Sequence, residues 1–282
     1  MNLTAMPYHN TLVLFSFVKL IFEAPNKTHT MKNTVLISIL LFSFIGCSSD
    51  DGDAVSRVEN VIPTDFTADM LYDYPDAEGL LTASQTILVQ TVLGIRERSQ
   101  SSGLALATFH ESPGALSYVR AGTVMLNDRE LSLQDKRVYA FEPSFSNMSG
   151  IDFESGRAEW SVSGSEDVES FSYTFEGFPA ELEFESNVND IDLSSNYTLE
   201  VSGVSDADSL LFIIAADGDF VVKRTDAAQS SVTFTAADFA PIRNSDKGLV
   251  QVTAFNLKPE QINSRKMYFV NAVNVNSLIN FK

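Results

Sequence analysis

The chain has 282 residues, of which 44% are hydrophobic and 11% aromatic, and its formal net charge is -18. This length and apolar content allow one large domain or two ordinary ones with a real core, and they exclude a disordered chain. The segment up to Cys47 carries Lys19, Lys27, Lys32 and Glu23, so the remainder has a net charge of -18 - 2 = -20. A body this acidic repels phosphate backbones and anionic lipids. We therefore expect no nucleic-acid binding, and membrane attachment would need an anchor other than charge.

The segment from Met31 to Cys47 reads MKNTVLISILLFSFIGC. One lysine follows Met31, apolar or small residues then run from Thr34 to Ile45, and Gly46 precedes the cysteine. The run is shorter than the roughly 20 residues that a membrane-spanning helix needs. It is not amphipathic and ends abruptly in an acidic stretch, which disfavours a core helix. A basic start, a short apolar region and a small residue before a cleavage point are typical of a signal peptide.

This arrangement resembles the signal peptide of bacterial lipoproteins, with Phe44-Ile45-Gly46 in place of the lipobox. Phe44 stands where that family usually has leucine. The resemblance implies that residues 31–46 are removed and that Cys47 is acylated; stable anchoring needs more than one acyl chain. The acidic run at residues 48–53, SSDDGD, is similar to the tether of surface lipoproteins in Bacteroidetes-type bacteria. That similarity implies an outer-membrane protein that faces the cell exterior.

Residues 1–30 fit neither a signal peptide nor a domain. They hold a second apolar patch, from Leu12 to Phe22, that Lys19 interrupts. The simplest interpretation is that translation begins at Met31 and that residues 1–30 are a mis-annotated extension. A membrane anchor of two segments is the alternative.

Residues 47–80 are expected to form the lipidated cysteine and a linker, because they mix Pro, Asp and Tyr with little periodicity. Period-two alternation of apolar and polar residues, typical of half-buried strands, follows. Residues 86–95 also fit a helix, and residues 104–110 are expected to be their hairpin partner. Strands in this half are predicted at 86–95, 104–110, 118–131 (with an Asn-Asp turn), 137–143, 157–164 and 170–177.

The pattern restarts near Phe178-Pro179. Seven further strands are predicted, at 181–186, 196–203, 209–217, 219–225, 231–239, 248–256 and 267–275. Their number and spacing resemble an immunoglobulin-like or fibronectin-III-like sandwich. We therefore expect an all-β protein with two antiparallel β-sandwich domains in tandem, residues 81–178 and 179–282, after the signal peptide and a flexible tether. The second domain is expected to be immunoglobulin-like.

Few residues suggest chemistry. One cysteine permits no intramolecular disulfide and no multi-cysteine zinc site. The body holds a single histidine, His110, which we expect at a strand end or on the surface, since no GxSxG motif accompanies it. Trp160 alternates with Glu159 and Ser161, so it is expected to point into the core.

Acidic pairs suggest calcium loops, which need several oxygen ligands close together. The pairs are Asp190 and Asp192, Asp206 and Asp208, and Asp217 and Asp219. None matches the EF-hand pattern, and residues 217–219 fit a hairpin turn better, so we expect no metal and no cofactor. Asp208-Ser209-Leu210 also resembles the short O-glycosylation pattern of Bacteroidetes.

The sequence favours a lipid-anchored cell-surface protein that is not an enzyme and has a binding or adhesive role. It shares its plan with glycan-binding lipoproteins of polysaccharide-utilisation systems, so glycan is the first ligand to test and a surface protein the second. A structural or assembly subunit of an outer-membrane complex is the alternative, followed by a hydrolase accessory protein. No ligand-binding residue can be named from the sequence; Cys47 is the one modified site it indicates.

Overall fold

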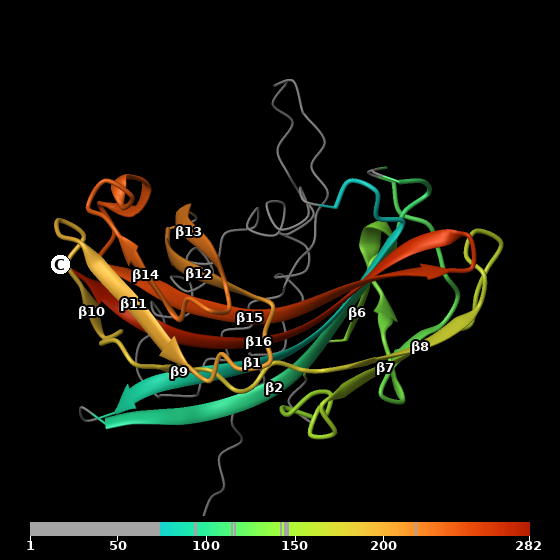
Figure 1. Cartoon of the computed structure of the whole chain (residues 1–282), viewed down its shortest axis with the longest axis horizontal. Helices are drawn as coiled ribbons and strands as arrows, with labels where there is room; N and C mark the ends of the chain where they lie inside the picture. The colour runs from blue at the N-terminus through green and yellow to red at the C-terminus, as the bar shows by residue number, and fades with distance from the viewer. Residues whose placement is uncertain are drawn as a thin grey trace, which may run out of the picture. The chain divides into compact units, whose positions relative to one another are not determined.

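The computed structural model describes residues 74–282, except for 93–94, 114, 116, 142, 144–146 and 218. The signal peptide, Cys47 and the acidic tether lie outside the described residues, so those predictions stay predictions. Sixteen strands and two short 3-10 turns make up the regular structure of these described residues, which confirms the all-β class (Figure 1). The strands are β1 (Gly79–Val92), β2 (Ile95–Phe109), β3 (Val124–Leu126), β4 (Arg129–Glu130), β5 (Ser132–Leu133), β6 (Tyr139–Phe141), β7 (Arg157–Val162), β8 (Phe171–Glu176), β9 (Glu183–Phe184), β10 (Asp190–Ile191), β11 (Tyr197–Ser202), β12 (Ser209–Ala216), β13 (Asp219–Asp226), β14 (Ser231–Phe234), β15 (Lys247–Ile262) and β16 (Arg265–Phe281).

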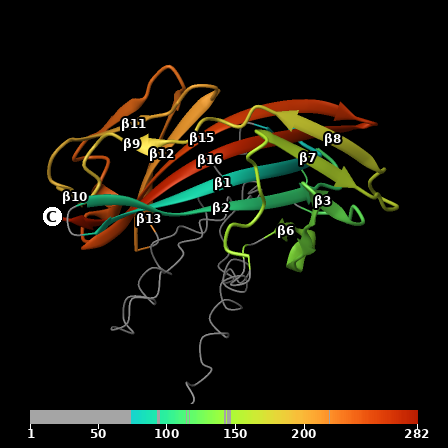
Figure 2. The ribbon, with the colours of Figure 1, turned by 90° about the horizontal axis from the view of Figure 1, so that it is seen from below.

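One large sheet organises the body. Its nine strands run in the order β13-β12-β15-β16-β1-β2-β6-β5, with β10 pairing β16. A three-stranded sheet, β14-β11-β9, and a four-stranded sheet, β4-β3-β7-β8, accompany it. Figure 2 shows the long strands β1, β2, β15 and β16 side by side, with β9 and β11 near one end and β7 and β8 near the other.

Strands β1 and β16 pair in parallel, from Gly79 opposite Met267 to Val89 opposite Ser277. The first and last long strands of the described chain therefore lie together at the centre of the large sheet. Strand β1 also pairs with β2 in an antiparallel hairpin, so residues 86–92 are strand. The predicted partner, residues 104–110, lies at the end of β2 but pairs with residues 79–84, whereas residues 86–92 pair with 95–102. The proposed helix over this stretch is wrong, because the ladders on both sides hold the backbone extended.

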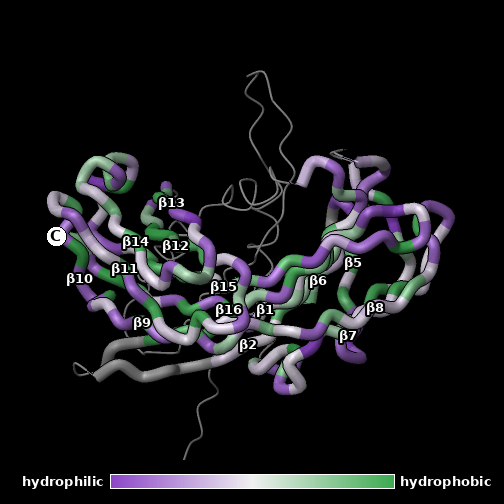
Figure 3. Tube along the Cα trace, in the orientation of Figure 1, coloured by the Kyte–Doolittle hydropathy of each residue, from purple (hydrophilic) through white to green (hydrophobic). Residues whose placement is uncertain are grey.

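Side-chain periodicity in each strand follows from how many of its faces are covered. Strand β7 lies in a small sheet with one solvated face, and its residues alternate between exposed and buried. Strand β12, SLLFIIAA, is buried at seven successive positions and forms an apolar stretch (Figure 3). A continuous apolar run is what a strand covered on both faces requires.

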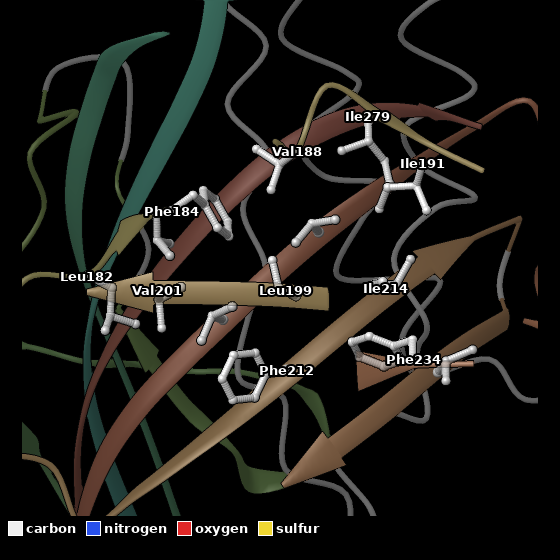
Figure 4. Close-up of a cluster of buried hydrophobic side chains, with 14 of the residues drawn as sticks. Leu182, Phe184, Val188, Ile191, Leu199, Val201, Phe212, Ile214, Phe234 and Ile279 are labelled. Atoms are coloured by element: carbon white, nitrogen blue, oxygen red, sulfur yellow. The ribbon is translucent and has the colours of Figure 1, made fainter. Parts of the chain in front are cut away.

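Two hydrophobic clusters lie on the same face of the large sheet, which we call the first face. The cluster beneath the four-stranded sheet holds Leu81, Trp160 and Phe269, and the cluster beneath the three-stranded sheet holds Phe212 and Phe234. Figure 4 shows the second of these, with Leu199 and Val201 of β11 among side chains of the large sheet. Fully burying one such side chain contributes about 1.5–3 kcal/mol.

The clusters fall mostly on either side of residue 178, but both contain residues of the long strands. Met267 and Phe269 belong to the first cluster, whereas Ile87 belongs to the second. The long strands β1 and β16 thus contribute to both cores. The division into two domains at 178/179 stays a prediction.

Two predicted turns are confirmed by their backbone geometry. Asn127 and Asp128 have φ of 46° and 60° between the paired residues Leu126 and Arg129, the conformation of a two-residue hairpin. Asp217 has φ of 52° where β12 turns into β13. Asn and Asp favour these positions because their short polar side chains tolerate the left-handed region.

Candidate binding surfaces

His110 lies at the end of β2, as expected, but the prediction of a surface position is wrong. Its side chain is only 2% exposed. The Nδ1 atom lies 2.8 Å from the carbonyl oxygen of Ala115, and the ring meets that of Tyr118 edge-on at 5.1 Å. Because a carbonyl only accepts, Nδ1 carries the proton. Burial lowers the pKa of His110 from its usual 6.5; the bond to Ala115 acts in the opposite direction, and the charge of Arg265 lowers it further.

Arg265 begins β16 and joins three segments that are far apart in the sequence. Its Nη1 donates to the carbonyl oxygen of His110 and its Nη2 to that of Asp167, each at 2.8 Å. The same Nη1 lies 4.0 Å from Oε1 of Glu78, and the side chains of Arg265 and Glu78 are 17% and 19% exposed. A planar guanidinium with several donors suits such a junction. It fixes the loop before β8 against the tip of the β15–β16 hairpin.

A hollow of about 160 Å³, which we call the hairpin pocket, opens beside this junction. Its walls are the loop before β8 and the hairpin turn, which Asn263, with φ of 53°, and Ser264 form. The lining offers carboxylates, an amide, a hydroxyl and one partly buried aromatic ring. These groups belong to Glu166, Asp167, Glu169, Asn263, Ser264 and Phe171.

Several of the aspartates that suggested calcium make local contacts through their carboxylates. Asp190 pairs with Lys282 at 3.1 Å, and Asp192 accepts bonds from the backbone and hydroxyl of Ser194. Asp208 Oδ2 accepts from the backbone N–H of Leu257, and Asp217 Oδ2 accepts from the hydroxyl of Ser245. Among residues 74–282, as far as they are described, no three His, Cys, Asp or Glu side chains are placed to hold a metal ion.

Trp160 lies in the core, as predicted, at 2% exposure. Its Nε1 has no hydrogen-bond partner, so the ring contributes apolar surface at the cost of one unpaired donor. It is therefore not a candidate for stacking on a ligand.

The opposite side of the large sheet, which we call the second face, carries neither small sheet. It is formed by alternate residues of five adjacent strands, and most of them are buried, whereas Leu278 near the end of β16 is exposed. Its apolar members are distributed over all five strands: Leu80, Leu88, Leu104, Leu106, Leu211, Ile213, Ala215, Leu249, Phe255, Tyr268, Val270 and Ala272. Its polar members lie mainly in the central strands: Thr82, Ser84, Thr86, Ser102, Thr108, Gln251, Thr253, Asn274 and Asn276.

A hydrogen-bonded chain of polar side chains crosses the second face. Gln251 Nε2 donates to Thr253 Oγ1 at 2.8 Å, and Thr253 donates to Asn274 Oδ1 at 2.6 Å. Asn274 Nδ2 in turn donates to Thr86 Oγ1 at 3.2 Å. Three buried oxygens remain without a partner: Gln251 Oε1, Asn276 Oδ1 and Thr108 Oγ1.

Neither the hairpin pocket nor the second face was predicted from the sequence. Arg265 and Asn263 carry no motif, and only the gap between two predicted strands indicates their turn. The second face has a visible signal, because Asn274 and Asn276, two positions apart, interrupt the apolar run AVNVN at 272–276. The predicted lipidation site, Cys47, lies outside the described residues.

Comparisons with known proteins find little. No protein-family model matches the chain, and no curated protein matches it. One similar solved structure is described as "Structural insight into host cell surface retention of a 1.5-MDa bacterial ice-binding adhesin". It shares 11% identity over 71% of this chain and 66% of that chain, with a TM-score of 0.22. A similarity at this level supports no argument about function.

Within the described residues, no helix has the length and hydropathy of a membrane span.

Proposed function

We propose that this chain is a lipid-anchored protein of the outer cell surface that binds an extracellular ligand, glycan first, through the hairpin pocket. We infer the class of ligand from the residues that line this pocket. Carboxylates, an amide and a hydroxyl around one aromatic ring offer the hydrogen-bond partners that sugar hydroxyls need. Arg265 holds both walls in place, so little ordering is required when a ligand binds.

The anchor rests on the leader that ends at Gly46-Cys47 and on the acidic run behind it. Between Cys47 and Tyr74 lie 73 - 47 = 26 residues. Fully extended, they would span at most about 90 Å. The body could therefore stand clear of a membrane while its lipid stays inserted.

The anchor is tested in cells. We expect the wild-type chain in the membrane fraction, sensitive to protease added to intact cells, with an N-terminal peptide whose mass fits acylated Cys47. Cys47→Ser should release it from the membrane. Recovery of an unmodified peptide that contains Met31 would reject the anchor.

The ligand is tested on the chain from Ser48 onward, with a glycan array followed by calorimetry on any positive sugar. Glu166→Gln combined with Glu169→Gln should weaken binding at least about tenfold, about 1.4 kcal/mol. The matched control is Glu183→Gln with Glu200→Gln, which makes the same change in charge at two exposed positions of the β9–β11 sheet and should leave binding unchanged. Capture of a surface protein with no glycan bound would favour the structural or assembly role instead.

A further inference from the structure

Both walls of the hairpin pocket continue as strands beyond the pocket. On one wall, Phe171 lines the pocket, and Tyr173 is the next residue of β8 on the same side. On the other wall, Ile262 lines the pocket, and Glu260 and Lys258 precede it at alternate positions of β15. Alternate residues of a strand point to the same face, about 7 Å apart. Tyr173, Glu260 and Lys258 therefore lie next to the pocket, on the side away from the hairpin turn.

These three side chains form one group, which we call the tyrosine cluster. Tyr173 Oη donates to Glu260 Oε1 at 3.0 Å, and Lys258 Nζ lies 3.0 Å from the same oxygen. The Tyr173 ring stacks on Phe269 of the core, with centroids 4.0 Å apart and planes at 28°, and the Lys258 ammonium lies 5.7 Å from the ring centre. The core thus holds the cluster in place, while the side chains of Lys258 and Glu260 are 53% and 32% exposed.

The tyrosine cluster has hydrogen-bonding groups to spare for a ligand. Tyr173 and Lys258 both contact Glu260 Oε1, which leaves Oε2 as an acceptor that no other described residue uses. The Lys258 ammonium has three donors and directs one of them at Glu260. The hydrogen bonds from Lys258 and Tyr173 lower the pKa of Glu260, so its carboxylate stays ionised and is a strong acceptor. A free acceptor beside free donors matches neighbouring hydroxyl groups on a sugar ring, since each hydroxyl both donates and accepts.

The size of the hairpin pocket indicates that a glycan would extend beyond it. Sites that enclose drug-sized ligands measure roughly 300–1,000 Å³, whereas this hollow measures about 160 Å³. It therefore suits a single sugar ring. Toward one end the hairpin stops at the turn of Asn263 and Ser264, whereas toward the other end both walls lead to the tyrosine cluster.

We propose that the tyrosine cluster is a second sugar subsite and that, together with the hairpin pocket, it binds a glycan of at least two units. This inference rests on the proposed function, because it places the first unit in the hairpin pocket. Glu260 Oε2 accepts from one hydroxyl of the second unit, and Lys258 donates to the neighbouring hydroxyl. Because the charges of Lys258 and Glu260 balance, the second unit is a neutral sugar. Stacking of Tyr173 on Phe269 positions the cluster in advance, so little ordering accompanies binding.

Calorimetry on the chain from Ser48 onward tests how many units are bound. The probes are glucose, mannose, galactose and N-acetylglucosamine, each as the single sugar and as its linear disaccharide and trisaccharide. We expect at least one disaccharide to bind about tenfold more tightly than its monosaccharide, as one added charged hydrogen bond would give. Equal affinities for the three lengths would overturn the second subsite and leave the proposed function in place. If no sugar binds, the proposed function fails and the second subsite fails with it.

Variants of the cluster show whether it provides this gain. Glu260→Gln keeps the shape of the side chain but removes its charge and one acceptor. It should reduce the affinity for the disaccharide to that for the monosaccharide, which should not change. Tyr173→Phe keeps the stacking on Phe269 and removes the hydroxyl, so it should lose part of the gain.

The matched control is Glu159→Gln in β7. Glu159 pairs with Arg157 two positions away in the strand, at 2.7 Å, just as Glu260 pairs with Lys258, and both side chains are about half exposed. The pair lies outside the pocket lining, so this variant should bind the monosaccharide and the disaccharide as the wild type does.

The comparison of the two sugars also separates a subsite from a structural role. A cluster that only held β8 on the hairpin would, when altered, weaken monosaccharide and disaccharide binding by the same factor, and that result would overturn the proposal. An undiminished gain in Glu260→Gln would overturn it too. The emission of buried Trp160 checks that each variant keeps its core.

Discussion

Gly103 and Gly150 lie backbone to backbone in a parallel bridge. The N–H of Gly103 donates to the carbonyl oxygen of Ser149 at 2.8 Å, and the carbonyl oxygen of Gly103 accepts from Ile151 at 3.0 Å. A Cβ on Gly103 would lie 1.8 Å from the Ile151 oxygen. Only glycine fits, so this contact attaches the loop after β6 to strand β2 of the large sheet.

Gly103→Ala should therefore lower the free energy of unfolding by about 1–3 kcal/mol, the usual cost of overpacking. Chemical denaturation measures it. Gly156→Ala is the control, because a Cβ there meets nothing within 4 Å and only the strain of its φ of 70° is added. A Gly103→Ala variant no less stable than Gly156→Ala would contradict the packing.

Asn256 joins β15 to two loops. Its Nδ2 donates to the carbonyl oxygens of Gly177 and Asp206 at 2.7 and 2.6 Å, and its Oδ1 accepts from the N–H of Asp208 at 2.8 Å. Asn256→Ala should cost about 1–3 kcal/mol in unfolding free energy. Asn256→Asp keeps the acceptor but loses both donors, so it should retain only a minor part of the stability. If Asn256→Asp matched the wild type, the two donated bonds would be shown to contribute nothing.

Burial of His110 predicts a pH dependence. Its pKa is lowered in the folded state, so between that value and 6.5 the unfolded chain binds more protons than the folded one. Stability should fall as pH falls through 6.5. His110→Asn retains a donor for Ala115 but does not titrate, so its unfolding midpoint should fall less between about pH 8 and about pH 5 than that of the wild type. Equal losses in both proteins would assign the effect to other groups.

Asp238 predicts a second loss of stability, at lower pH. Its hydrogen bond to Lys223, at 2.8 Å, and that from the Thr235 backbone lower its pKa from 3.8 to about 2. A depressed carboxyl pKa stabilises the fold above 3.8, and that contribution is lost as pH falls toward about 2. The carboxyl carbon of Asp238 in NMR titration should report this low midpoint, and Lys223→Gln should raise it. A midpoint near 3.8 in the wild type would contradict the pair.

Trp160 provides a probe of the core as well as a prediction. Its emission should be blue-shifted and resist quenching by iodide until the chain unfolds, because the side chain is 2% exposed. Trp160→Ala should cost about 3–5 kcal/mol. Trp160→Phe should cost much less, since it also removes the unpaired Nε1–H.

Much of the secondary structure could be predicted because alternation reports directly on how one strand is covered. Phe171, Tyr173 and Phe175 share a side of β8, and the residues between them are exposed, as their period of two indicates. The same signal placed Trp160 inward. It cannot report which strands are neighbours, since any strand with a suitable face satisfies it.

His110 shows that the sequence pattern cannot predict the burial of a single residue at a strand end. A histidine after an apolar strand has the same sequence signature whether it meets water or Tyr118, and the loop that covers it carries no motif. The hairpin pocket shows why a site of this kind cannot be predicted. Glu166 and Asn263 are nearly one hundred residues apart, and Arg265 connects their segments through its hydrogen bond to Asp167.

The sequence alone therefore determined the all-β class, the positions of most strands and turns, the burial of Trp160 and the leader-like segment that ends at Cys47. Only the tertiary structure decided that β1 pairs in parallel with β16, that both small sheets cover one face, and that the other face buries a chain of hydroxyls and amides. The reason is physical. The local sequence pattern reflects whether each residue is buried or exposed. Which strands pair, and which sheet packs on which face, depends on contacts between distant segments, and the sequence of one segment does not specify its partner.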